Sequence, residues 1–269
     1  MWLILLVIVL CVAIVITRRR FKYNEINYKC FLLTLPNSSI RREKFLKNHN
    51  KSIPIEIIYG VDTKDVENAK KFQHIIDPKY FEQAMKIHYN NKNLRPDITY
   101  FNLGAIGCYM GHMDFYRRCF EQGLKYAVIF EDNVVISDIE LYNEIQKVIN
   151  TLGDDFEMCF FHCLSRYSNG NVTKDIEKVK WISSTKCYLI NVENMEKYYK
   201  FYFPMDNHVD MKHEDLIAKG ARVFYKDLRH CMYIDRTKSS TIGHSEHYKP
   251  NFFSKQYPTA TPKVLKYGY

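Results

Sequence analysis

The sequence predicts an α/β fold: one mixed, mainly parallel sheet of Rossmann-like type, flanked by helices. Short apolar runs recur along the chain, and the first, CFLLTL at 30–35, suits a strand buried on both faces. Segments with helical patterning alternate with these runs, which is typical of a parallel sheet. The 269 residues are enough for one sizeable core.

A strand-helix-strand unit opens the predicted domain. After the run at 30–35, Pro36-Asn37-Ser38-Ser39 supplies turn and helix-cap chemistry, and a helix is expected over 40–49. A second strand is expected over 53–59, and Gly60-Val61-Asp62 closes it. Such a unit indicates parallel strands.

A helix and a strand then lead to two acidic residues and an amide. The segment 103–122 reads as a helix with small residues in its first turns, which allow a ligand or a second backbone to come close. Strand 126–130 follows and ends at Glu131-Asp132-Asn133. Open α/β sheets bind ligands at the carboxyl ends of their strands.

The remaining expected elements complete the sheet and its helical layers. Strands are expected over 158–164, 186–190 and 221–225, and helices over 141–152, 191–201 and 214–219. The segment 64–93 is polar and irregular, with helical parts.

The N-terminus predicts a membrane anchor in front of this domain. Residues 1–17 carry no charged side chain, and as a helix they would span about 25 Å, slightly less than a bilayer core. A basic linker, 18–29, contains Arg18-Arg19-Arg20, which by the positive-inside rule favours a cytoplasmic domain. Glycosylation triplets such as Asn171-Val172-Thr173 would fit a lumenal domain instead. The prediction is a single-pass membrane protein with a domain at 30–245 and a tail at 246–269.

Charge and cysteine content narrow the possible functions. The net charge of +9 fits a solvated basic surface, an anionic ligand or a lipid bilayer, and no nucleic-acid motif accompanies it. The eight cysteines form no CxxC pair, which favours free thiols. Zinc could be bound by Cys159 and Cys163 with His162 and His230, since these residue types are zinc ligands. The apolar residues that flank them favour buried strands instead.

Four motifs in order carry a family resemblance. They are LTLPNSSIRREKFLKN with IEIIYGVD, then LGAIGCYMGHMDFYRRCFEQGLKYAVIFEDNVVI, then FPMDNHVD, then RVFYKDLRHCMYIDRTKSSTIG. In this order they resemble glycosyltransferase family 25, the lipooligosaccharide-biosynthesis and collagen galactosyltransferase group, from residue 30 to about 243.

The resemblance implies a GT-A fold and a UDP-sugar donor. It also implies Mn2+, or Mg2+, and inverting transfer of a hexose such as galactose or glucose to a glycan or a hydroxylated protein acceptor. Three residues depart from the family pattern: Asn133 replaces an acid, Ala105 a Glu and Gly111 a Ser. The alternative is therefore a catalytically weakened protein that binds a sugar or nucleotide, or acts as a scaffold.

The leaving diphosphate explains why acidic residues would end a buried strand. A hard divalent cation neutralises the diphosphate, and carboxylate oxygens hold the cation. Asp132 and Asn133 are the expected metal ligands, with His244 as an imidazole ligand from the tail.

Other site residues follow from the same motifs. Residues expected to contact the donor are Leu35, Arg42, Asp62, Gly107, His112 and Glu131. Arg42, with its neighbour Arg41, suits phosphate and Asp62 suits uridine or ribose, although a surface arginine or a buried core histidine is an ordinary alternative. Candidate bases are Asp206 and Asp210, of which Asp206 falls on the family motif; Glu214 and Asp215 are further candidates.

Overall fold

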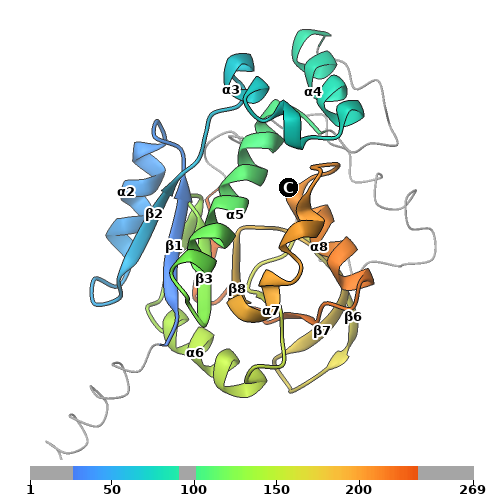
Figure 1. The fold of residues 1–269 in the computed structure, drawn as a ribbon. Helices are drawn as coiled ribbons and strands as arrows, with labels where there is room; N and C mark the ends of the chain where they lie inside the picture. Colours follow the sequence, from blue (N-terminus) through green and yellow to red (C-terminus); the bar gives the residue numbers. More distant parts are fainter. Residues whose placement is uncertain (1–26, 91–100, 236–269) are drawn as a thin grey trace, which may run out of the picture.

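The computed structural model describes residues 27–90 and 101–235. Its main feature is an eight-stranded sheet in the order β2-β1-β3-β8-β5-β9-β7-β6 (Figure 1). The pairings across the sheet show that β8 and β7 run against the other six strands, so the predicted mixed, mainly parallel sheet is confirmed. In sheet order the strands are Ile55–Tyr59, Lys29–Thr34, Tyr126–Glu131, Cys187–Asn191, Met158–Phe160, Val223–Tyr225, Glu177–Ser183 and Ser165–Asn171.

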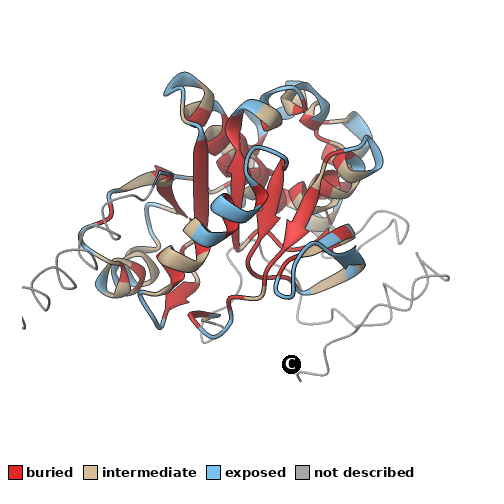
Figure 2. Ribbon diagram, turned by 90° about the horizontal axis from the view of Figure 1, so that it is seen from below, coloured by how far each residue is buried: buried red, intermediate tan, exposed pale blue. Residues whose placement is uncertain are grey.

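Helices cover both faces of this sheet. On one face α5 (Leu103–Glu121), α7 (Val192–Glu196) and α8 (Val209–Ala218) share an apolar cluster with every second strand residue, among them Phe31 and Leu33. On the other face α2 (Ser39–Asn48) and α6 (Leu141–Leu152) pack on the alternate residues, such as Leu32. The central strands are therefore buried on both sides, as Figure 2 shows.

Smaller elements complete the described chain. The segment that follows β2 contains α3 (Val66–Lys70), a 3-10 turn (Gln73–Ile75) and α4 (Pro78–Asn90), and it lies at the top of Figure 1. A second sheet pairs β4 (Val134–Ile136) with β10 (Met232–Ile234), and a 3-10 turn (Tyr199–Tyr202) follows α7.

The structure differs from the sequence prediction in several places. The strand expected over 158–164 ends at Phe160. The helix expected over 191–201 ends at Glu196 and resumes only as the 3-10 turn, and α8 begins at Val209, five residues before the expected start. The β6–β7 hairpin was not predicted. The sequence SRYSNGN is polar and largely exposed because β6 is an edge strand, so it shows no apolar pattern.

The prediction of a single-pass membrane protein is corrected. Across residues 27–90 and 101–235, no helix combines the length and the apolar character needed to cross a bilayer. The apolar segment at 1–17, the linker at 18–26 and the tail at 246–269 lie outside the described residues. The cysteines in the described part are all free thiols, as predicted.

Candidate active site

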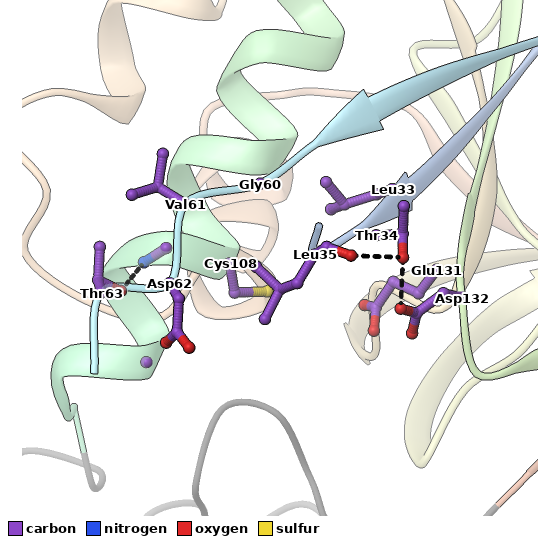
Figure 3. Close-up of a pocket in the computed structure, with 12 residues that line it drawn as sticks. Leu33, Thr34, Leu35, Gly60, Val61, Asp62, Thr63, Cys108, Glu131 and Asp132 are labelled. Carbon is purple, nitrogen blue, oxygen red and sulfur yellow. Dashed lines mark hydrogen bonds between the residues drawn. The ribbon is translucent and has the colours of Figure 1, made fainter. Parts of the chain in front are cut away.

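A pocket lies at the carboxyl ends of β1, β2 and β3 (Figure 3). The strand ends and the first turns of α5 line it. The lining residues are Leu33, Thr34, Leu35, Gly60, Val61, Asp62, Thr63, Gly104, Gly107, Cys108, Glu131 and Asp132.

Strand register brings these residues together. β1 pairs in parallel with both neighbours, with Leu33 opposite Ile58 on β2 and opposite Glu131 on β3. Two backbone hydrogen bonds extend the pairing past the strands: Gly60 N donates to Thr34 O (2.8 Å) and Asp132 N donates to Leu33 O (3.1 Å). The chain therefore leaves all three strands at one edge, as predicted for a ligand site.

Gly107 lets α5 approach the loop after β2. Its backbone N donates to Thr63 Oγ1 (2.8 Å), and Thr63 Oγ1 donates to the Leu103 carbonyl (2.5 Å). A Cβ at position 107 would overlap the Val61 carbonyl oxygen and lie 2.6 Å from Thr63 Oγ1. Gly107 thus lines the pocket and sets the distance between its walls.

We expect Gly107→Ala to move the loop at 60–63 and to lower the free energy of unfolding by about 1–3 kcal/mol, since an added methyl in packed structure forces backbone shifts. Denaturant unfolding measures the change. Gly60→Ala is the matched control, because the nearest atom to its added Cβ is a flexible Leu35 methyl at 3.4 Å. Equal stability of the two variants would contradict this account of the loop.

Asp132 faces the pocket with room on one oxygen. Oδ2 accepts a hydrogen bond from Thr34 Oγ1 (2.8 Å), and Oδ1 lies 3.6 Å from Arg41 Nη1. The side chain is 9% exposed. Burial raises the pKa of Asp132, although the Thr34 hydroxyl and Arg41 act in the opposite direction. A carboxylate whose charge is disfavoured by burial gains from a bound cation.

Glu131 is held by a close ion pair. Lys186 Nζ lies 2.6 Å from Oε2, and Thr185 Oγ1 donates to Oε1 (2.5 Å). Burial alone would raise the pKa of Glu131, but the Lys186 ammonium outweighs it and holds the pKa well below its ordinary value. Glu131 therefore lines the pocket as a paired, charged carboxylate.

Arg41, rather than Arg42, lies beside the pocket residue Asp132. Arg42 Nη1 donates to the carbonyls of Leu35 (3.1 Å) and Pro36 (3.4 Å), and its guanidinium lies over the Tyr59 ring. It therefore supports the turn after β1. Arg41, one position earlier on α2, points toward Asp132. The two alternate because successive residues of a helix point about 100° apart.

His112 is completely buried behind Glu131. Its Nδ1 lies 2.8 Å from the Tyr188 hydroxyl, and its Nε2 lies 3.8 Å from Glu131 Oε1. His112 does not line the pocket, so a donor would be reached only through Glu131. The ordinary alternative, a core histidine, describes its surroundings better than direct contact with the donor.

Asp62 lies across the pocket from Glu131 and Asp132, the acidic pair. Its carboxylate points into the open space on the far side of Leu35 and Cys108 from Glu131 and Asp132 (Figure 3). Oδ1 accepts from the Lys64 backbone N (3.2 Å), which fixes the turn. Asp62 and Leu35 both line the pocket, and their contact with a donor stays a prediction.

The two candidate bases differ in their surroundings. Asp206 is paired with Lys212 Nζ (2.6 Å), and its side chain is 42% exposed, away from the pocket lining. Asp210, at the start of α8, accepts from Ser183 Oγ (3.3 Å). Burial lowers the pKa of Lys186, but the carboxylates of Glu131 and, to a smaller extent, Asp210 raise it, with a net rise. Asp210 does not line the pocket.

The other predicted metal ligands are only partly described. Asn133 does not line the pocket, but its buried Oδ1 has no hydrogen-bond partner in the described part of the chain. His244 lies outside the described residues.

Sequence reasoning missed several contributors to the site, among them Thr34, Cys108 and Lys186. Thr34 and Cys108 lay inside recognised motifs, as part of a strand and a helix. No sequence pattern marked Lys186 as a site residue. Only the antiparallel pairing of β8 with β3, in which Cys187 lies opposite Phe130, brings Lys186 beside Glu131.

Comparisons with known proteins agree with the motif order. A family model described as glycosyltransferase family 25 (LPS biosynthesis protein) matches residues 27–237. Among curated proteins, no sequence matches the chain. Solved structures similar to it include A197 from STIV, at 10% identity and a TM-score of 0.42, covering 82% of this chain and 100% of that one. UTP-bound UGPase from Acinetobacter baumannii, at 8% identity, also has a TM-score of 0.42 and covers 75% of this chain and 86% of that one.

These structural likenesses are too distant to carry an argument, and the assignment comes from the family model. That model spans the sheet and the pocket described above, with all of the acidic pair inside it. The chain belongs to glycosyltransferase family 25.

Proposed function

We propose that this protein transfers a hexose, galactose or glucose, from a UDP-sugar to a hydroxyl group of a glycan or a protein. The transfer inverts the anomeric carbon and uses a divalent cation, Mn2+ or Mg2+. The observation that supports it most is the position of Asp132. Its carboxylate lines a pocket at the carboxyl ends of three parallel strands, in a member of a glycosyltransferase family.

The oxygens at this edge suit a hard cation. Asp132 offers Oδ1, and the next residue, Asn133, offers an amide oxygen that is buried without a partner in the described part of the chain. Carboxylate and amide oxygens are ligands that Mg2+ and Mn2+ accept, with phosphate and water in the other positions. When bound, such a cation would neutralise charge on the leaving UDP.

The walls of the pocket suit the rest of the donor. The amino-terminal end of α5, where Gly104 and Gly107 line the pocket, carries the positive end of the helix dipole, which favours a diphosphate. Arg41 adds a guanidinium on the side of Asp132. Asp62, opposite, accepts hydrogen bonds from ribose hydroxyls or the uracil NH.

Asp210 is the proposed base, in preference to Asp206, because Lys212 already pairs with Asp206. In the transfer, the Asp210 carboxylate takes the proton of the acceptor hydroxyl. The oxygen of that hydroxyl bonds to the anomeric carbon, and the bond from this carbon to the terminal phosphate oxygen of UDP breaks. UDP leaves with the bonding electron pair.

The proposal is tested by product-nucleotide release. The full-length chain is incubated with UDP-galactose or UDP-glucose, with Mn2+ or with EDTA, and UDP is measured. We expect Mn2+-dependent UDP release from one of the two donors. If the protein shows no turnover and no binding with either donor, the proposal is rejected.

The second candidate is a protein that binds the nucleotide-sugar without turnover. The carboxylates of Asp132 and Glu131 already face a cation, Arg41 and Lys186 respectively, and Asn133 supplies no charge. Both candidates predict binding, and UDP with Mn2+ at a hundred times the Kd raises the free energy of unfolding by about 2.7 kcal/mol. UDP release that appears only in Asn133→Asp would favour the second candidate; robust turnover by the wild type would remove it.

A further inference from the structure

A second cluster of ligating side chains lies beneath the pocket, on the α5 side of Glu131. It contains Cys108 and His112, one turn apart on α5, together with Glu131 at the end of β3. One ligand atom from each, a sulfur, a nitrogen and an oxygen, lie within 4.8 Å of one another. The spacing of four residues puts Cys108 and His112 on one face of the helix.

The unpartnered ring nitrogen of His112 points into this cluster. His112 is 0% exposed, and its Nε2 has no hydrogen-bond partner in the described part of the chain. The nearest acidic oxygen, Glu131 Oε1, lies 3.8 Å away, which is beyond hydrogen-bond distance. A buried nitrogen without a partner is costly unless something binds it.

The hydrogen bonds behind His112 put a lone pair on this nitrogen. Tyr116 Oη accepts from the hydroxyls of Tyr188 (3.1 Å) and Tyr202 (3.2 Å), and it donates to His213 Nε2 (3.1 Å). The Tyr188 proton is therefore used, and Tyr188 Oη accepts from His112 Nδ1 (2.8 Å). A neutral His112 then carries its proton on Nδ1, which is the arrangement of a histidine that binds metal through Nε2.

We propose that Cys108 Sγ, His112 Nε2 and Glu131 Oε1 form a binding site for a borderline-soft divalent cation of the Zn2+ or Co2+ class. Thiolate and imidazole ligands favour such ions over Mn2+ and Mg2+, which prefer oxygen. The site is therefore distinct in ligand class from the oxygen site proposed at Asp132. Cys108 and Glu131 line the pocket, so the ion enters from it.

The cluster needs only a small contraction to hold the ion. In a tetrahedral zinc site the ligand atoms are roughly 3.3–3.7 Å apart, so the widest separation closes by about 1 Å. Lys186 binds Oε2 of Glu131 (2.6 Å), and Oε1 lies on the side of His112. Oε1 also accepts a hydrogen bond from Thr185 Oγ1 (2.5 Å), and its second lone pair is the one offered to the ion. Burial raises the pKa of the Cys108 thiol, with the Glu131 charge adding to it, so the cation replaces a thiol proton on binding.

Co2+ serves as the spectroscopic probe, because a cobalt–thiolate bond gives a charge-transfer band in the near ultraviolet. The full-length protein is freed of metal with a chelator and titrated with Co2+ in the absence of donor. We expect this band at one Co2+ per chain, and we expect added Zn2+ to remove it. This readout needs no sugar transfer, so it stands or falls separately from the proposed function.

Variants assign the ligands. Cys108→Ser should lose the band, while Cys119→Ser, which removes another cysteine of the same helix, should keep it. Glu131→Gln should keep the band and bind more weakly. Tyr188→Phe removes the hydroxyl that accepts from His112 Nδ1 and donates to Tyr116, and we expect it to weaken Co2+ binding by roughly 10–100-fold.

Two results would overturn the site. One is the absence of any thiolate band in the wild type. The other is a band that persists in folded Cys108→Ser, which would assign the cobalt to a different cysteine. Should Cys108→Ser fail to fold by circular dichroism, unchanged Co2+ affinity in both Glu131→Gln and Tyr188→Phe would equally reject the site.

Discussion

Asp132→Asn is expected to lower Mn2+-dependent UDP release on the order of a thousandfold, since a lost metal ligand removes several kcal/mol of transition-state stabilisation. The substitution keeps the shape of the side chain and an oxygen that can accept from Thr34 Oγ1. Initial rates with saturating donor and a series of Mn2+ concentrations measure the effect.

The unfolding temperature of Asp132→Asn shows whether the loss of UDP release comes from a structural defect. Burial raises the pKa of Asp132 in the folded protein. The protonated Asp132 side chain therefore stabilises the fold below the ordinary pKa of an aspartate, and this stabilisation is lost as pH rises through the folded pKa. At neutral pH the buried charge costs stability, and Asp132→Asn should unfold at the same temperature as the wild type or higher. Asp175→Asn, in an exposed turn between β6 and β7, is the matched control and should keep full activity. Wild-type rates in Asp132→Asn would remove Asp132 from the metal site.

Lys186→Met is expected to lower the free energy of unfolding by about 3 kcal/mol at neutral pH, because it leaves the Glu131 charge buried without its main partner. In the wild type, the ammonium lies 2.6 Å from Oε2, and the side chains are 22% and 12% exposed. Denaturant unfolding measures the change.

The pH dependence identifies the cause. The lowered pKa of Glu131 gives stability that is present above about pH 4.3, the ordinary value for a glutamate, and is lost as pH falls through the folded pKa. The difference between the wild type and Lys186→Met should therefore be largest at neutral pH and shrink toward acid. Lys125→Met is the control, since it breaks an exposed pair with Asp154 and should change stability little. A loss that is independent of pH would point to packing instead.

Much of the domain could be predicted because local patterns coincide with tertiary burial. The run CFLLTL became β1, with alternate residues in the two apolar clusters, and YAVIF became β3 in the same way. The helix from Leu103 and its small residues also match. The polar hairpin β6–β7 could not be predicted, because an exposed edge strand needs no apolar alternation.

The sequence by itself determined that two acidic residues, Glu131 and Asp132, end a strand buried on both faces and that this strand belongs to a mainly parallel sheet. Each follows from residues that are neighbours in the chain. Only the tertiary structure decided which partner each carboxylate has. Thr34 lies 98 positions from Asp132, and Lys186 lies 55 positions from Glu131. Strand register fixes these contacts, and a slip of one residue would turn every side chain of the strand to the opposite face.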